Sequence, residues 1–139
     1  MIVLIDADVL VDVALDRSPF ATQAISLLDE LERRPGGCYV AWHSPSNFYY
    51  LVAPLRGKAS AREFLLDLCR FCDVAPTTTR SLRFAASLAL ADFEDALQVA
   101  AAAACGADVI ATRNTRDYAK SPIRAAKPED VVKELRSGR

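Results

Sequence analysis

Three groups of acidic residues in the sequence could do metal-assisted chemistry. Asp6 and Asp8 follow an apolar run at the N-terminus, Asp92-Phe93-Glu94-Asp95 opens an alanine-rich segment, and Asp117 follows a second apolar run. Carboxylates gathered in one place repel each other unless a cation shares their charge, and the hard cations Mg²⁺ and Mn²⁺ prefer carboxylate oxygens. The acids therefore predict a metal site that could activate water for attack on a phosphodiester.

Composition narrows the other kinds of site. His43 is the one histidine, which excludes a histidine-rich metal centre. Four cysteines include a single C-x-x-C pair, Cys69 and Cys72, without a second pair or a nearby histidine, so buried thiols are favoured over zinc ligands. A formal net charge of -1 argues against broad attachment to nucleic acid, although a small basic patch beside an acidic pocket remains compatible with it.

Length and hydropathy predict one domain over residues 1–139. The chain is 52% hydrophobic and 25% charged, as in ordinary globular proteins, and is long enough to build one core. No apolar stretch approaches the roughly 20 residues of a membrane-spanning helix, and acids stand where a signal peptide carries basic residues. We therefore expect a cytoplasmic protein that does not associate with membranes.

Apolar segments alternate between short strand-like and longer helix-like patterns, which predicts an α/β fold with a central, mainly parallel sheet of four to five strands. The expected order is β-α-α-β-α-α-β-α-α-β-β-α. We expect strands at residues 2–5, 38–42, 73–75, 108–112 and 123–125. After a helix that directly follows the first strand, we expect helices to begin near Ser18-Pro19, Ser44-Pro45-Ser46 and the capping-box sequence Ser60-Ala61-Arg62-Glu63, to span 79–89 and 92–105, and to begin again at Pro128.

These elements explain how distant acids could meet. In open α/β sheets, ligands bind outside the carboxyl ends of the strands. Asp6 and Asp8 follow the first strand, while Arg113, Asn114 and Asp117 follow the fourth. The sequence therefore predicts one site at this edge of the sheet.

The chain resembles the PIN-domain family in three motifs, Ile5-Asp6-Ala7-Asp8-Val9-Leu10, Asp92-Phe93-Glu94-Asp95-Ala96-Leu97-Gln98 and Thr112-Arg113-Asn114-Thr115-Arg116-Asp117-Tyr118. The resemblance implies a three-layer α/β/α fold and Mg²⁺- or Mn²⁺-dependent cleavage of RNA. It also suggests a homodimer and, since many bacterial members are toxins of toxin-antitoxin pairs, a small antitoxin partner.

The same resemblance assigns catalytic and metal-binding roles to particular residues. Asp6, Asp95 and Asp117 correspond to family carboxylates, with Asp92 and Asn114 as further candidate ligands. One departure is Asn47, which stands where many members carry glutamate. An amide can bind a cation through its oxygen but brings no negative charge. Metal affinity could therefore be lower, or Glu94 or Asp8 could compensate.

Each candidate also has a plainer interpretation. Asp92 and Asp95 suit the N-cap and first turn of a helix, and Asp117 suits a turn. Asp8 is interpreted first as a helix cap, and Asp12 as a solvent-facing residue.

The basic residues are likewise ambiguous. Arg113 and Arg116, with Lys120, could bind substrate phosphates or could belong to a solvated loop, and Arg17 is a less favoured phosphate contact.

Three functions stay open at this point. The first is a metal-dependent endoribonuclease. The second is a weakened PIN-like RNA-binding or regulatory module, motivated by Asn47. The third is a phosphatase of the haloacid-dehalogenase type, because Asp6-Ala7-Asp8 follows an apolar strand as in those enzymes. The chain is short for that class and lacks a convincing downstream lysine and paired-aspartate motif.

Overall fold

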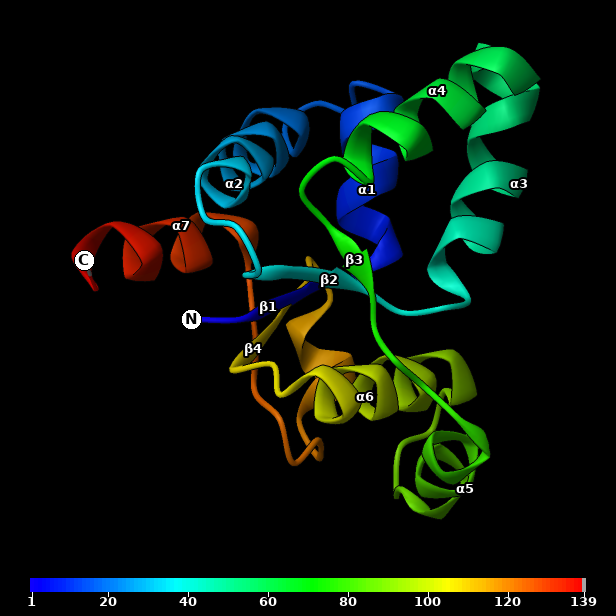
Figure 1. Cartoon of the computed structure of the whole chain (residues 1–139), viewed down its shortest axis with the longest axis vertical. Coiled ribbons are helices and arrows are strands. Elements are labelled where there is room, and N and C mark those ends of the chain that lie inside the picture. Colours follow the sequence, from blue (N-terminus) through cyan, green and yellow to red (C-terminus); the bar gives the residue numbers. More distant parts are fainter. Residues whose placement is uncertain (139) are drawn as a thin grey trace.

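The computed structural model describes residues 1–138 and contains within them one sheet of five parallel strands. The spatial order is β3-β2-β1-β4-β5 (Figure 1). The strands are β1 (Val3–Ile5), β2 (Cys38–Val40), β3 (Asp73–Val74), β4 (Val109–Ala111) and β5 (Ala125–Ala126). The prediction of a mainly parallel sheet with four to five strands is confirmed.

Helices cover both faces of the sheet. They are α1 (Ala7–Ala14), α2 (Ala21–Glu32), α3 (Ser44–Arg56), α4 (Lys58–Leu68), α5 (Thr79–Ser87), α6 (Phe93–Cys105) and α7 (Pro128–Ser137), with a 3₁₀ turn, η1, at Thr115–Tyr118. Figure 1 shows α1, α2, α3, α4 and α7 on one side of the strands and α5 and α6 on the other. This is the predicted three-layer α/β/α arrangement. Among the described residues, no helix is both long and apolar enough to cross a membrane.

The central strands are apolar at every position because both of their faces are covered. Val3 and Ile5 pack into the cluster formed with α1, α2 and α7, whereas Leu4 and Ile110 pack into the cluster formed with α6. All four side chains are fully buried. The strand register therefore determines which residues directly follow the carboxyl ends of the strands.

Two predicted helix starts were wrong. The helix expected at Ser18-Pro19 begins at Ala21, whose N–H donates to the carbonyl of Arg17, so residues 18–20 form a turn before it. The helix expected at Ser60 begins at Lys58, directly after Gly57. Because Gly57 has φ +90°, a conformation that glycine adopts without strain, it separates α3 from α4 with no intervening loop.

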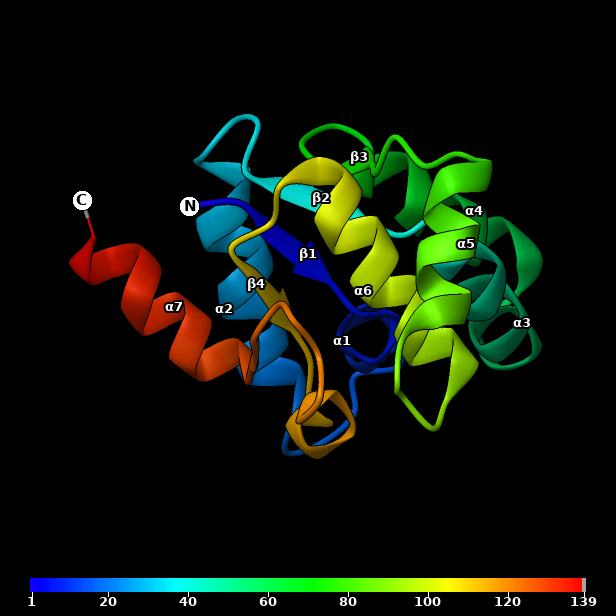
Figure 2. The same cartoon turned by 90° about the horizontal axis from the view of Figure 1, so that it is seen from below.

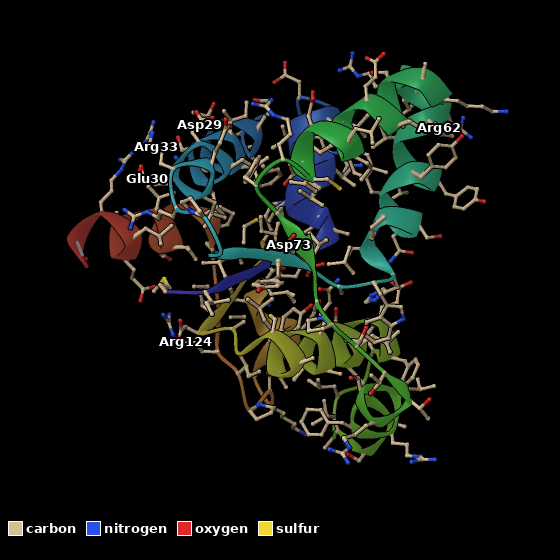
Figure 3. The ribbon with its side chains drawn as sticks, viewed as in Figure 1. Asp29, Glu30, Arg33, Arg62, Asp73 and Arg124 are labelled. Atoms are coloured by element: carbon tan, nitrogen blue, oxygen red, sulfur yellow. The ribbon has the colours of Figure 1, made fainter. Side chains whose placement is uncertain are left out.

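Away from the acidic edge, α2 is joined to α7 by a group of charged residues. Figure 3 shows Glu30 and Arg33 on the part of α2 that lies next to α7. Glu30 is buried and accepts from Arg33 Nη1 at 3.0 Å and from Arg136 Nε of α7 at 3.3 Å. This contact holds the layer opposite α6 together.

Candidate metal centre

Asp6 stands where β1 ends and α1 begins. Its N–H still donates to the carbonyl of Ala111 on β4 at 3.0 Å, which continues the strand pairing by one residue. Its Oδ2 accepts two hydrogen bonds, from Thr112 Oγ1 at 3.0 Å and from the Tyr118 hydroxyl at 3.0 Å. The carboxylate is therefore fixed by the segment that follows β4.

Asp8, in the first turn of α1, is turned toward the same segment. Its Oδ2 accepts from Thr112 Oγ1 at 3.1 Å, from the Arg113 N–H at 3.1 Å and from Asn114 Nδ2 at 3.2 Å. The interpretation of Asp8 as a helix cap was wrong: the N-cap residue of α1 is Asp6, with no side-chain capping bond. Three donors from across the sheet edge engage the side chain instead.

Asp95 is held at the start of α6. Asp92 is the N-cap residue, and its Oδ1 accepts from the Asp95 N–H at 3.1 Å, so the capping prediction for Asp92 is confirmed. The Tyr118 hydroxyl that donates to Asp6 also interacts with the Asp95 carboxyl. Tyr118 therefore links Asp6, at the end of β1, with Asp95 on α6. Figure 2 shows α6 running alongside β1.

An open cavity of about 480 Å³ lies at this edge and gathers several predicted site residues. Its lining includes Asp6, Asp8, Asn47, Glu94, Asp95 and Asn114, together with Ala7, Val11, Arg17, Tyr50, Leu51 and Gln98. Asp92, Arg113, Arg116 and Asp117 are not among the lining residues. Asp117 is exposed on η1, yet its charge acts on Asp95, so it lies near the cavity.

The pKa values of three carboxyl groups in the cavity are raised. Burial raises the pKa of Asp6, although the hydrogen bonds from Tyr118 and Thr112 oppose this effect. Burial and the charge of Asp6 raise the pKa of Asp8 to about 7. Burial, with the charges of Asp92 and Asp6, raises the pKa of Asp95 to about 6. A bound cation would relieve this repulsion and favour the ionised forms.

The donors present fit a magnesium-like cation. Oδ1 of Asp8 is buried and accepts no hydrogen bond from any described residue, and carboxylate and amide oxygens line the same cavity. Within residues 1–138, no group of three or more His, Cys, Asp or Glu side chains is placed to hold a metal ion by itself. Mg²⁺ is commonly bound by one or two carboxylates together with water and substrate phosphate, and an open site suits that mode.

The raised pKa of Asp8 predicts a pH-dependent effect of the substitution Asp8→Asn. Because the folded pKa lies above the unfolded value, the wild-type carboxyl contributes most stability at low pH and loses it as the pH rises through about 7. In EDTA, Asp8→Asn should therefore raise the melting temperature more at pH 8 than at pH 5. Differential scanning calorimetry of both proteins measures this.

Comparing the two proteins at each pH cancels the opposite contribution of His43, whose pKa is lowered by burial. The exposed Asp130, in the first turn of α7, supplies the control Asp130→Asn. A shift for Asp8→Asn that is the same at both pH values, as expected for the control, would contradict the electrostatic account.

Arg113 and Asp12 form an ion pair that the sequence did not reveal. Asp12 is only 1% exposed, so its interpretation as solvent-facing was wrong. Its two carboxylate oxygens accept from Nε and Nη2 of Arg113, the second at 3.1 Å, and the guanidinium lies over the ring of Phe20 at 4.1 Å from its centroid. The Arg113 side chain is thus engaged within the protein, whereas Arg17 lines the cavity.

Sequence reasoning missed three supporting residues. Thr112 donates to both Asp6 and Asp8, and Tyr118 contacts Asp6 and Asp95. Gln98 Nε2 donates to Ser44 Oγ at 2.9 Å in a buried contact that ties α6 to α3. A signal for Thr112 and Tyr118 was available, since both lie in the motif that contains Asn114 and Asp117.

A comparison with protein families decides the assignment. A model of the PIN domain matches residues 2–116. The chain belongs to the PIN-domain family. The match confirms the family resemblance; it covers all of the cavity-lining residues and the first two motifs, and it ends within the third, one residue before Asp117. It also separates the chain from haloacid-dehalogenase-type phosphatases.

Solved structures agree with the PIN fold. One is the crystal structure of VapBC2 from Rickettsia felis bound to a DNA fragment from their promoter, with a TM-score of 0.69 and 13% identity over 91% of this chain and 98% of that chain. Another is FitAB bound to an IR36 DNA fragment, with a TM-score of 0.64 and 17% identity over 92% and 96%. No curated protein matches the sequence. At these identities, the likeness supports the PIN fold alone.

Proposed function

We propose that this PIN domain is a Mg²⁺- or Mn²⁺-dependent endoribonuclease that hydrolyses RNA phosphodiester bonds with Asp6, Asp95 and Asp117. The observation that carries the proposal is the meeting of Asp6 and Asp95, 89 positions apart in the sequence, in one cavity where burial raises the pKa of both and the charges of Asp92 and Asp6 further raise that of Asp95. Such perturbed carboxyl groups in a cleft are typical of functional sites.

The surrounding residues prepare the carboxylates for this role. Thr112 and Tyr118 fix one oxygen of Asp6, and the Asp92 cap fixes the helix turn that presents Asp95. Mg²⁺ or Mn²⁺, when bound, supplies polarisation of the phosphodiester and activation of water. Asp117, on the exposed turn η1, adds negative charge near Asp95, and Asn114 lines the cavity and donates from Nδ2 to Asp8 Oδ2 at 3.2 Å.

The exposed residues that line the cavity are the best candidates for substrate contacts. Arg17 is the one Lys or Arg among the cavity-lining residues, and its side chain is 42% exposed. Tyr50 lines the same cavity and is 73% exposed, which suits stacking on a base of single-stranded RNA. Arg113 and Arg116 remain further candidates for phosphate contacts outside the cavity lining.

A cleavage assay tests the proposal. Fluorescently labelled single-stranded RNA is incubated with the wild-type protein in Mg²⁺, in Mn²⁺ and in EDTA, and with Asp95→Asn in Mn²⁺. We expect internal cleavage by the wild type with either metal and loss of cleavage in EDTA and in the variant. Equal products in all four reactions would reject the proposal, because a contaminating ribonuclease would then explain them.

Asn47 favours one alternative, a PIN-like RNA-binding or regulatory module with weakened catalysis. An amide at a cavity position where many family members carry glutamate removes one negative charge. The alternative predicts RNA binding without cleavage and no calorimetric heat of Mn²⁺ binding. Appearance of cleavage only in Asn47→Glu would favour it over the nuclease.

A substitution at Arg17 tests the substrate contact. Arg17→Ala should raise KM for RNA about three- to tenfold with little change in kcat. The lost phosphate contact would stabilise the bound substrate and the transition state equally. The salt dependence of RNA binding should also become shallower, by roughly 0.7 in the slope for a single strand. Steady-state kinetics at two salt concentrations measure both effects.

Lys133→Ala serves as the control, since Lys133 is exposed on α7 and lies outside the cavity lining. If both substitutions raise KM equally, Arg17 makes no specific contact.

We also propose that the protein acts in the cytoplasm as the toxin of a toxin-antitoxin pair, as a homodimer neutralised by a small antitoxin. The family resemblance and the two similar structures, VapBC2 and FitAB, both solved as complexes on DNA, support this proposal. Induction of the gene alone should arrest growth, and co-expression of the adjacent open reading frame should restore it. Sedimentation velocity measures the oligomeric state.

A further inference from the structure

Glu94 places a negative charge next to Asn47, which has none. Asn47 lies in the first turn region of α3 and Glu94 in the first turn of α6, and both side chains line the acidic cavity. Asn47 Nδ2 donates to Glu94 Oε2 at 3.3 Å, although the two residues are 47 positions apart in sequence. The two helices thus bring an amide and a carboxylate together where the PIN fold otherwise offers one acidic side chain.

The chemistry of this contact orients both groups. An ionised carboxylate only accepts hydrogen bonds, so the nitrogen of the Asn47 amide must face Glu94, and its oxygen is directed elsewhere. The buried bond from Gln98 to Ser44 joins the same two helices and fixes their separation. Glu94 is therefore held over the cavity by a neighbour, which an exposed first-turn acid would not otherwise be.

Glu94 and Asp6 share a neighbour in His43. The charges of Glu94 and Asp6 both act on the ring of His43, which directly precedes α3. Glu94 and Asp6 are thus both within electrostatic range of the same histidine. The ordinary role of a first-turn glutamate, stabilising the helix by about 0.3–1 kcal/mol, explains neither the amide contact nor this placement.

We propose that Glu94 supplies the metal-binding negative charge that Asn47 does not, with Asn47 as the residue that positions it. The acidic position has in effect moved from α3 to α6 of the PIN fold. This inference rests on the proposed metal dependence of the site and specifies which of its side chains bind the cation. With Glu94 in this role, the cavity keeps the negative charge that asparagine in place of glutamate at position 47 would otherwise remove.

Mn²⁺ binding to the metal-free protein tests the inference without relying on catalysis. Isothermal titration calorimetry and electron paramagnetic resonance of free Mn²⁺ are applied to the wild type, Glu94→Gln and Glu129→Gln. Glu129 is the matched control, a glutamate in the first turn of α7 and outside the cavity lining. Glu94→Gln should weaken Mn²⁺ binding at least 10–100-fold, the effect known for residues that only support metal ligands, and Glu129→Gln less than about twofold.

A charge-swap variant separates position from mere charge count. Glu94→Gln combined with Asn47→Glu returns the carboxylate to α3, and it should recover Mn²⁺ affinity to within a few-fold of the wild type. Asn47→Ala alone should weaken binding about three- to tenfold, and it should add little in the Glu94→Gln background because the two residues act through one contact. Circular dichroism establishes that each variant is folded.

The outcomes distinguish this inference from the proposed function. If the wild type binds Mn²⁺ no better than Asp6→Asn, the metal-dependent function itself is rejected. If Asp6→Asn loses binding while Glu94→Gln binds as tightly as Glu129→Gln, only the role of Glu94 is rejected. A folded swap variant that stays as weak as Glu94→Gln likewise overturns the exchange of positions.

Discussion

Asp6→Asn should reduce RNA cleavage at least about 100-fold and at the same time raise the melting temperature of the metal-free protein. Loss of a residue that only supports a metal ligand costs 10–100-fold, so loss of a proposed ligand should cost more. Burial raises the pKa of Asp6, which means that the fold disfavours its ionised form. A neutral amide of the same shape removes that penalty while its oxygen can still accept from Thr112 and Tyr118.

Opposite changes in activity and stability are the signature of a functional residue. Cleavage rates with Mn²⁺ and melting curves in EDTA provide the two measurements, and melting curves with Mn²⁺ add a third. The metal should raise the melting temperature of the wild type, by the equivalent of about 2.7 kcal/mol at 100 times its Kd, and leave Asp6→Asn unchanged.

Asp130→Asn is the control, since Asp130 is an exposed aspartate in the first turn of α7. It should keep full activity and should not gain stability. If Asp6→Asn loses activity only in proportion to a lowered melting temperature, Asp6 is a structural residue and the proposed mechanism is wrong.

The fold and the placement of Asp6 and Asp95 at one cavity could be predicted because they depend on local pattern. Buried parallel strands are continuously apolar, and Asp6 is the first polar residue after one of them. Asp95 lies one helical turn after the capping residue Asp92. Strand ends and helix starts are visible in a sequence, and the topology of a parallel sheet then brings them to one edge.

The errors concern side chains whose partners lie far away in the sequence. Asp8 has the position of a helix cap, but Thr112, Arg113 and Asn114 engage it from 104 or more positions away. Asp12 has the spacing of a surface residue, yet Arg113 covers it. Local preference cannot report such contacts, because the competing donor is supplied by the tertiary fold.

Asn47 also shows what a sequence cannot reveal about distant contacts. The sequence identified the missing charge and named Glu94 and Asp8 as residues that could compensate, but nothing in the spacing of 47 residues distinguishes them. The structure gives the two residues different neighbours. Asp8 accepts three hydrogen bonds on Oδ2 from the segment after β4 and keeps a buried Oδ1 without one, whereas Glu94 accepts from Asn47 across the cavity.

Arg113→Met should lower the free energy of unfolding by about 3–5 kcal/mol, the largest loss of stability that we expect from a single substitution near the site. Asp12 is 1% exposed, and removing Arg113 leaves this buried carboxylate with only the more distant Arg17, at 3.8 Å. An uncompensated buried charge is far more costly than the absence of the whole pair. Chemical denaturation monitored by circular dichroism measures the change.

The double variant Arg113→Met with Asp12→Val should recover most of that loss, because both charges are then replaced by apolar groups. Arg116→Met, at an exposed neighbouring position, should change stability by less than about 0.5 kcal/mol. If instead Arg113→Met retains wild-type stability but raises KM for RNA, then Arg113 binds substrate, as the sequence first suggested. The acidic cavity would then draw its phosphate contacts from the segment after β4, and the role proposed for Arg17 would be smaller.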